Sequence, residues 1–343
     1  MARQTNGAEP PKNESRPGEG NGVVKILFKY NAVLLLVIMF IVACTLSEHF
    51  LSSGNLVNIL RQQSTYMLVA LGMLTVMLTG GIDLSVSSVV AVASIMVPYC
   101  LKIWGLQNEP WGLMVSIIIA VAMGFLFGAM NGFLIARLNM PAFIVTLAMM
   151  YAAKGVAYII TDANTILLDS NIPAVQVFIG FSTGRIGGIP YEVILMIILV
   201  VVFFFLMHYT GFGRLITATG SNEQAVQLAG INSRKYKFWA YTISGTLCGV
   251  AGLIIASRSG SATALTTQTN FDMTTIAAVV IGGASLKGGE GSVHMTVVGV
   301  FVLAVIGNIM NLTQLGVYPQ LVVKAVIIVM AVLLKSVSSK ASD

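Results

Sequence analysis

The sequence predicts an all-α, polytopic membrane protein with about ten transmembrane helices. Of its 343 residues, 56% are hydrophobic and only 9% are charged, and the mean hydropathy is +0.87. Soluble domains carry about 25% charged residues, so this composition excludes a soluble protein. Apolar runs of roughly 18–22 residues recur along most of the chain, as crossing a bilayer core of ~30 Å requires.

Ten segments have the apolar character of membrane spans. In chain order they are residues 26–46, 57–79, 86–103, 111–136, 141–160, 190–208, 236–256, 271–284, 291–311 and 318–335. Residues 1–24 are rich in Pro, Gly and Glu and nearly free of apolar residues, which predicts a disordered cytoplasmic tail. Residues 25–338 then form one transmembrane domain, followed by a short cytoplasmic tail at 339–343.

Lysine and arginine concentrate in alternate loops, which sets the orientation because cytoplasmic loops carry an excess of both. The predicted cytoplasmic residues are Arg137, Arg214, Arg234, Lys235, Lys237 and Lys287, together with the basic residues of both tails. Only Arg185 is a clear basic exception on the outer side. An even number of spans then places both termini in the cytoplasm. The basic residues are too dispersed to predict nucleic-acid binding.

Two glycine-rich sequences are similar to each other. TGGIDLS at 79–85 and IGGASLK at 281–287 share GG-x-x-L, and each follows an apolar run. Asn131 and Pro141 follow the first, and Asn308 and Pro319 follow the second. The sequence therefore suggests two weakly related halves, and glycine-interrupted segments at matching places indicate a transport path.

Asp83 lies between two apolar segments, where an ionised carboxylate facing lipid costs ~2.5–3.5 kcal/mol. We expect Gly80 and Gly81 to break the helix there. Asp83 and Ser85 would then cap the next helix. Two interpretations remain open at this point, a structural cap and a break that lines a translocation path or gate.

The segment SNEQAVQLAG at 221–230 predicts a cytoplasmic helix of about two turns. Ser221 and Gln224 match a capping box, and Gly230 is a suitable helix end. A helix this short is marginal alone. We therefore favour a helix that docks on another protein over a solvated surface helix. The predicted contact residues are Gly220, Ser221, Glu223, Ala225, Leu228 and Gly230.

Several motifs resemble one family. TGFGRLITATGSNEQAVQLAGI at 210–231 resembles the cytoplasmic coupling loop of bacterial ABC-importer permeases for ribose, galactose and xylose. LTGGIDLSVSS at 78–88, PAFIVTLAMMYAAKGVAYIIT at 141–161 and IAAVVIGGASLKGGEGSV at 276–293 resemble other signatures of that family. The likeness covers about residues 55–335. Ser87, in place of the usual glycine, and Lys154, in place of the frequent arginine, depart from its pattern.

The resemblance implies a permease subunit in the bacterial inner membrane, paired with a second permease subunit, most simply an identical one. It also implies a separate ATPase that uses ATP and Mg²⁺, and a periplasmic or lipid-anchored sugar-binding protein that contacts the outer loops 161–189 and 257–272. This chain itself is expected to bind no cofactor or metal and to be no enzyme. GGASLKGG at 282–289 lacks the GK[ST] ending of a phosphate loop.

A path for a neutral sugar needs amide and hydroxyl groups more than charges. The predicted path or gate residues are Gly80, Gly81, Asp83, Ser85, Asn131, Thr146 and Asn308. Other polar membrane residues either line the path or tie helices together; they are Gln62, Gln63, Asn311 and Gln314. Ribose is the favoured cargo.

Two alternatives within transport remain open. One is a branched-chain amino-acid ABC permease, and the other is a secondary sugar transporter driven by an ion. The second would need several intramembrane carboxylates, and Asp83 is the main candidate in the sequence.

Overall fold

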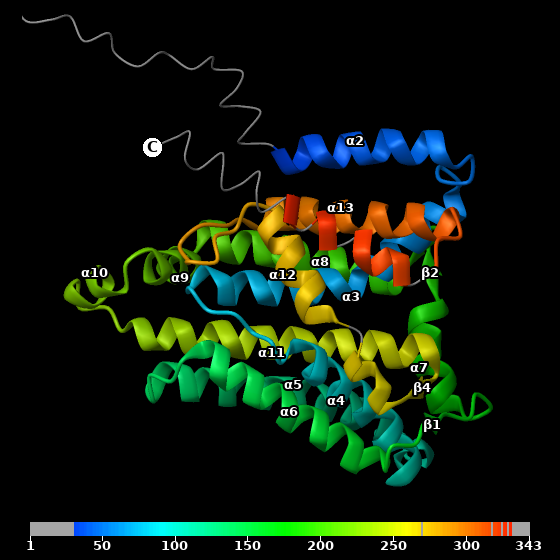
Figure 1. The fold of residues 1–343 in the computed structure, drawn as a ribbon. Helices are drawn as coiled ribbons and strands as arrows, with labels where there is room; N and C mark the ends of the chain where they lie inside the picture. The colour runs from blue at the N-terminus through cyan, green and yellow to red at the C-terminus, as the bar shows by residue number, and fades with distance from the viewer. Residues whose placement is uncertain (1–30, 269, 317, 324, 328, 331–343) are drawn as a thin grey trace, which may run out of the picture.

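The computed structural model describes residues 31–268, 270–316, 318–323, 325–327 and 329–330, which form a bundle of packed helices (Figure 1). The predictions for the tails at 1–24 and 339–343 lie outside the described residues. Helices α9 (Gly211–Ser221) and α10 (Glu223–Leu228) lie at one end of the bundle, called here the α10 end. Helix α7 (Pro173–Thr183) lies at the opposite end, called here the α7 end.

Every predicted span coincides with helical structure where it is described. The long elements are α2 (Asn31–Leu46), α3 (Ser53–Leu78), α4 (Val86–Pro98), α5 (Gly112–Arg137), α6 (Ala142–Thr161), α8 (Tyr191–Tyr209), α11 (Ser233–Ser259), α12 (Phe271–Ile281) and α13 (Val293–Leu312). A π-helical turn, Tyr99–Ile103, extends α4. Residues 318–323, in the tenth predicted span, are helical.

Six helices in the described ranges are long and apolar enough to cross a bilayer, so the chain is a multi-pass membrane protein. Helices α2 and α12 have 16 and 11 residues and fall short of that length. The number of ten spans therefore stays a prediction, as do the two related halves. The two similar glycine pairs differ in conformation. In the first pair the glycine with a positive φ is the first one, Gly80, and in the second pair it is the second one, Gly283.

The loops predicted to lie on the outer side contain structure that the sequence patterns did not predict. β1 (Ile166–Leu167) pairs antiparallel with β4 (Ser261–Ala262), which joins the loops 161–189 and 259–270 at the α7 end. β2 (Arg185–Ile186) pairs with β3 (Ile189–Pro190) in a short hairpin. Two 3₁₀ turns, Leu106–Asn108 and Ala264–Gln268, complete the described elements.

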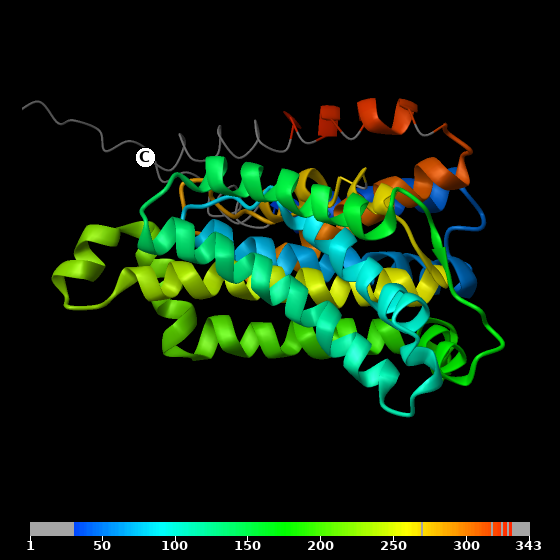
Figure 2. The same cartoon turned by 90° about the horizontal axis from the view of Figure 1, so that it is seen from below.

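Glycines bring the backbones of α5 and α11 into direct contact. Gly124, Gly128 and Gly132 recur every fourth residue and so share one face of α5. A Cβ at Gly124 would overlap the Gly245 carbonyl, and one at Gly132 would lie 2.6 Å from the Phe238 carbonyl oxygen. Small residues permit this approach in membrane bundles, where packing and hydrogen bonds drive association. Helices α6 and α8 lie on opposite sides of this core (Figure 2).

This packing makes Gly128→Ala destabilising. The added Cβ would lie 2.5 Å from the Tyr241 carbonyl oxygen and 3.0 Å from the Gly245 Cα, so one helix must move. Overpacking of this kind costs ~1–3 kcal/mol, which we expect as a lower thermal unfolding midpoint in detergent. Gly155→Ala in α6 is the matched control, because its Cβ would meet nothing within 4 Å. Equal midpoints for the two variants would contradict the close packing.

Candidate functional site

Residues 79–81, called here the double-glycine turn, follow the end of α3 and direct the chain back into the bundle. α3 ends at Leu78, and Gly80 takes the left-handed conformation with φ 80°. The segment then runs into the interior until α4 begins at Val86 (Figure 1). Asp83 is 1% exposed there. The predicted helix break is therefore present, and its carboxylate is inside the protein.

Asp83 is the centre of a buried cluster of hydrogen bonds. Its Oδ1 accepts bonds from the Ser85 amide at 3.0 Å and the Ser85 hydroxyl at 2.5 Å. Its Oδ2 accepts from the Ser244 hydroxyl of α11 at 3.2 Å. The Asn131 amide of α5 donates to Ser85 Oγ at 2.9 Å. The fold therefore brings three predicted site residues together and adds Ser244, which the sequence reasoning missed.

The capping prediction for these two residues is wrong in its detail. Ser85 occupies the N-cap position of α4 but makes no side-chain cap bond, because its hydroxyl is directed to Asp83. Asp83 binds the amide of Ser85 and not one in the first turn of α4. The two side chains thus hold the segment before the helix in place.

Two further predicted residues fix the same segment from other sides. The Thr146 hydroxyl of α6 lies 3.2 Å from the Ile82 carbonyl and donates to it. A Cβ at Gly81 would overlap the hydroxyl of Tyr241, so the end of this α11 side chain packs directly against the turn. Residues 80–85 are therefore held by α5, α6 and α11 together.

A second buried carboxylate joins the starts of α4 and α12. The Ser87 hydroxyl donates to Asp272 Oδ1 at 2.8 Å, and the Asp272 amide donates to Ser87 Oγ at 3.1 Å. α4 and α12 therefore begin beside each other inside the bundle. Helices that start within the membrane are a feature of transport proteins. Asp272 was missed, although its place at the start of an apolar run resembles that of Asp83.

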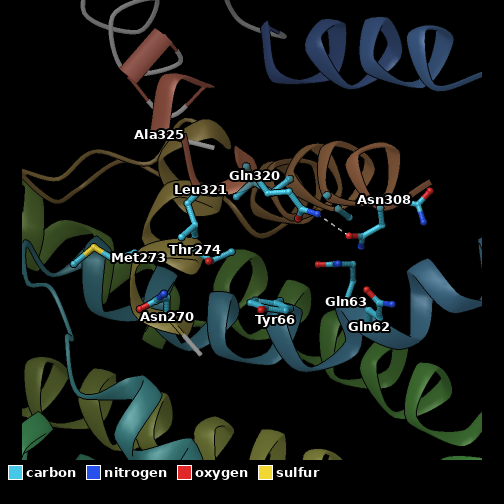
Figure 3. Close-up of a pocket in the computed structure, with 14 residues that line it drawn as sticks. Gln62, Gln63, Tyr66, Asn270, Met273, Thr274, Asn308, Gln320, Leu321 and Ala325 are labelled. Atoms are coloured by element: carbon cyan, nitrogen blue, oxygen red, sulfur yellow. Dashed lines mark hydrogen bonds between the residues drawn. The ribbon is translucent and has the colours of Figure 1, made fainter. Parts of the chain in front are cut away.

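A cavity of about 400 Å³ opens between α3, α12, α13 and the residues Gln320, Leu321 and Ala325 (Figure 3). Its polar lining is Gln62, Gln63, Tyr66, Asn270, Thr274, Asn308, Asn311 and Gln320. None of the described residues that line it is charged. Small-molecule sites commonly measure roughly 300–1,000 Å³. The predicted residue Asn308 lies here, apart from the Asp83 cluster, and exchanges two hydrogen bonds with Asn55 at 3.0 and 2.8 Å.

Three charged residues that the sequence reasoning did not single out meet at the α7 end. Glu192 is fully buried and accepts from Arg61 Nε and from an Arg258 Nη atom, each at 2.7 Å. Arg61 also donates to the Ser182 carbonyl, and Arg258 to the Arg61 carbonyl. The cluster ties α3, α8 and α11 together. Its members are far apart in sequence and share no local motif.

The predicted coupling segment 221–230 contains a shorter helix than expected. α10 has six residues, and its N-cap is Asn222, whose Oδ1 accepts the Ala225 amide at 2.9 Å. The capping box on Ser221 and Gln224 is therefore wrong, because Ser221 is the last residue of α9. Gly230 does end the helix, in the left-handed conformation with φ 78°.

Glu223 ties α10 to the start of α11, while Ala225 and Leu228 face outward. Its carboxylate accepts from the Ser233 hydroxyl at 3.0 Å and from Lys237 Nζ at 2.6 Å. Burial alone raises the pKa of Glu223, but the bonds from Lys237 and Ser233 and the nearby positive charges bring it below its usual value. The tie is therefore complete at neutral pH and is lost only as pH falls through that lowered pKa. Leu228 is 90% exposed.

Comparison with known proteins places the chain in a family. The family model described as "Branched-chain amino acid transport system / permease component" matches residues 55–333. The chain belongs to this permease family. No solved structure matches the permease.

Relatives of the permease carry the names of sugar permeases. It is 36% identical over 307 residues to the ribose import permease protein RbsC of Escherichia coli (strain K12), covering 90% of this chain and 93% of the relative. It is 34% identical over 306 residues to the fructose import permease protein FruF of Bifidobacterium longum (strain NCC 2705), covering 85% and 84%. It is 31% identical over 337 residues to the L-arabinose transport system permease protein AraH of Escherichia coli (strain K12), covering 98% and 97%.

The ion-pair cluster gives a test of how the permease is held together at the α7 end. Removing one partner of a fully buried pair costs roughly 3–5 kcal/mol, and because both arginines are partly exposed we expect Glu192→Gln to lose ~2 kcal/mol of stability. The measurement is the thermal unfolding midpoint of the purified permease. Glu109→Gln, at an exposed position near the same end, is the control and should leave the midpoint unchanged. A Glu192→Gln variant as stable as the wild type would contradict the proposed tie.

Proposed function

We propose that this permease is the membrane subunit of an ATP-binding cassette importer that moves a monosaccharide, most simply ribose, across the bacterial inner membrane. The observation that carries the proposal is the cavity of about 400 Å³ lined by amides and hydroxyls. An amide side chain both donates and accepts hydrogen bonds, as a sugar hydroxyl does. The names of the relatives, which specify ribose, fructose and L-arabinose, support a sugar over other cargo.

An amino-acid cargo fits this cavity less well. A zwitterion has a carboxylate and an ammonium group, and each needs an opposite charge or a helix end when it leaves water. The described lining offers neutral amides, Tyr66 and Thr274 instead. The family description refers to branched-chain amino acids, so uptake of labelled leucine and ribose by the same vesicles is the direct comparison.

The ion-driven alternative has more carboxylates than the sequence suggested, because Glu192 and Asp272 are buried as well as Asp83. Glu192 is already paired with two arginines, and Asp83 accepts three hydrogen bonds. Both are occupied as structural acceptors, which favours ATP as the energy source. Uptake that needs a proton or sodium gradient and no ATP would establish the alternative.

Charge supports placing the α10 end in the cytoplasm. The predicted cytoplasmic residues Arg234, Lys235 and Lys237 all lie at the start of α11, next to α10. In this orientation α10 meets an ATPase that uses ATP and Mg²⁺. The outer loops 161–189 and 257–272, joined by the β1–β4 ladder, then face a sugar-binding protein, and a second permease subunit completes the path.

The cavity predicts a cargo-specific effect for Gln63→Leu. Loss of one hydrogen bond to a neutral group costs ~0.5–1.5 kcal/mol, so we expect kcat/KM for ribose uptake to fall roughly three- to tenfold. The assay is ATP-driven uptake into proteoliposomes that contain the permease with its ATPase and binding protein. Gln107→Leu, also toward the α7 end but outside the cavity lining, is the control. Unchanged uptake by the Gln63 variant would count against this cavity as part of the path.

The docking role of α10 predicts that Leu228→Glu separates uptake from ATP hydrolysis. Leu228 contributes little to folding at 90% exposure, so insertion and thermal stability should stay at the wild-type values. Placing a charge in an apolar docking surface should lower uptake about tenfold or more. Leu138→Glu is the matched control, an exposed leucine at the α10 end outside α10. Normal uptake by the Leu228 variant would contradict the docking helix.

A further inference from the structure

The loop between α12 and α13 contacts the ends of two other helices at the α10 end. We call residues 285–291 of this loop the glycine loop. The amide of Gly289 donates to the carbonyl of Leu78, the last residue of α3, at 3.0 Å. The carbonyl of Gly289 accepts from the hydroxyl of Ser221, the last residue of α9, at 3.5 Å. One residue thus bonds to both helices.

The three segments meet backbone against backbone. A Cβ at Gly220 would overlap the Leu78 carbonyl, and one at Gly289 would lie 2.7 Å from the Ser221 Cα. A Cβ at Gly80 would lie 3.2 Å from the Lys287 carbonyl. Apart from the Ser221 hydroxyl, the atoms nearest to these glycines belong to the backbone. Because packed interiors have low compressibility, a displacement of one segment must move the others.

The glycine loop is itself closed by hydrogen bonds. The Ser285 amide donates to the Glu290 carbonyl at 2.9 Å, and the Gly288 amide donates to the Ser285 carbonyl at 3.2 Å. The Lys287 amide donates to the Ser285 hydroxyl at 3.2 Å. These bonds give the loop a fixed shape, so it can transmit a displacement instead of absorbing it.

The two helix ends that it joins have separate roles in the proposed mechanism. Ser221 immediately precedes Asn222, the N-cap of α10. Leu78 immediately precedes the double-glycine turn, which continues to the buried Asp83. The route from α10 to the membrane interior through this junction is therefore short. It is also distinct from the route through the Glu223–Lys237 pair and α11.

We propose that the glycine loop is a second coupling element, which carries movement of α10 through Gly220 and Gly289 to the double-glycine turn. Gly220 and Gly289 are positioning residues in it, because they act through the segments that they contact. The inference rests on the proposed ATP-driven function. It goes further in assigning a role to the loop between α12 and α13 and in naming the contacts that transmit the movement.

Two pairs of variants test this role, each with a matched control. Gly220→Ala is compared with Gly211→Ala, because both lie in α9 and a Cβ at Gly211 would meet nothing within 4 Å. Gly289→Ala is compared with Gly105→Ala. Their φ values are 76° and 73°, so both strain the backbone, but only Gly289 is in contact. The measured quantity is the sugar moved per ATP hydrolysed in proteoliposomes of the complete transporter.

Coupling between sites typically changes an equilibrium roughly 5–150-fold, so we expect Gly220→Ala and Gly289→Ala to lower this ratio at least about tenfold. For Gly289→Ala, which lies outside the predicted contact residues of the ATPase, the ATPase rate, the KM for sugar and the amount of inserted protein should stay near the wild-type values. Both controls should keep the wild-type ratio. A general loss of stability would reduce uptake and ATP hydrolysis together and leave the ratio unchanged. Uncoupling lowers the ratio, so the two effects can be distinguished.

A milder variant decides the outcome if the glycine variants do not fold. Ser221→Ala removes only a hydroxyl that is shared between the Thr217 carbonyl at 3.1 Å and the Gly289 carbonyl at 3.5 Å, and it should still lower the ratio measurably. A wild-type ratio in Gly220→Ala, or in Ser221→Ala where the former does not insert, overturns the role of the glycine loop. If Leu228→Glu uncouples at the same time, the proposed function stands and only this inference fails.

Discussion

The direct contact between the backbones of α5 and α11 is the constraint on which the rest of the structure depends. Gly124, Gly128 and Gly132 remove the side chains that would keep the helices apart. As a result Asn131 of α5 and Ser244 of α11 both reach the segment that carries Asp83. Burying an ionised carboxylate is costly unless hydrogen bonds replace those of water. The packing of two apolar helices therefore makes a buried acid tolerable.

The same helix α11 connects the two ends of the permease. At its start Lys237 pairs with Glu223 of α10, and near its end Arg258 pairs with Glu192. Its 27 residues correspond to a rod of ~40 Å, enough to cross the membrane. In the proposed mechanism an ATPase moves α10, and α11 and the glycine loop carry that movement to the interior. The transition can occur only if the two conformations of the permease bind the ATPase with different affinities.

Polar residues inside the bundle serve two purposes, which their surroundings distinguish. The bonds around Asp83, Asp272 and Glu192 hold segments together, and their partners come from several helices. Gln62 and Gln63, by contrast, face a cavity (Figure 3). Asn308 combines the two, since it lines the cavity and bonds to Asn55. Residue type alone could not separate these roles, because an amide is suited to both.

The sequence by itself determined where the long apolar helices lie, the break at Gly80, the end of α10 at Gly230, and the motifs that resemble sugar permeases, but it did not predict α7 or α9. These features are local, because the length of an apolar run and a glycine at a helix end act within a few residues. The cap of α10 was also local, yet Ser221 and Asn222 both suit that position, and only the fold selected Asn222. Tertiary structure alone decided that Ser87 meets Asp272, that Glu192 joins Arg61 and Arg258, and that the glycine loop reaches Leu78. Those partners are brought together by helix packing, which no pattern along one segment encodes.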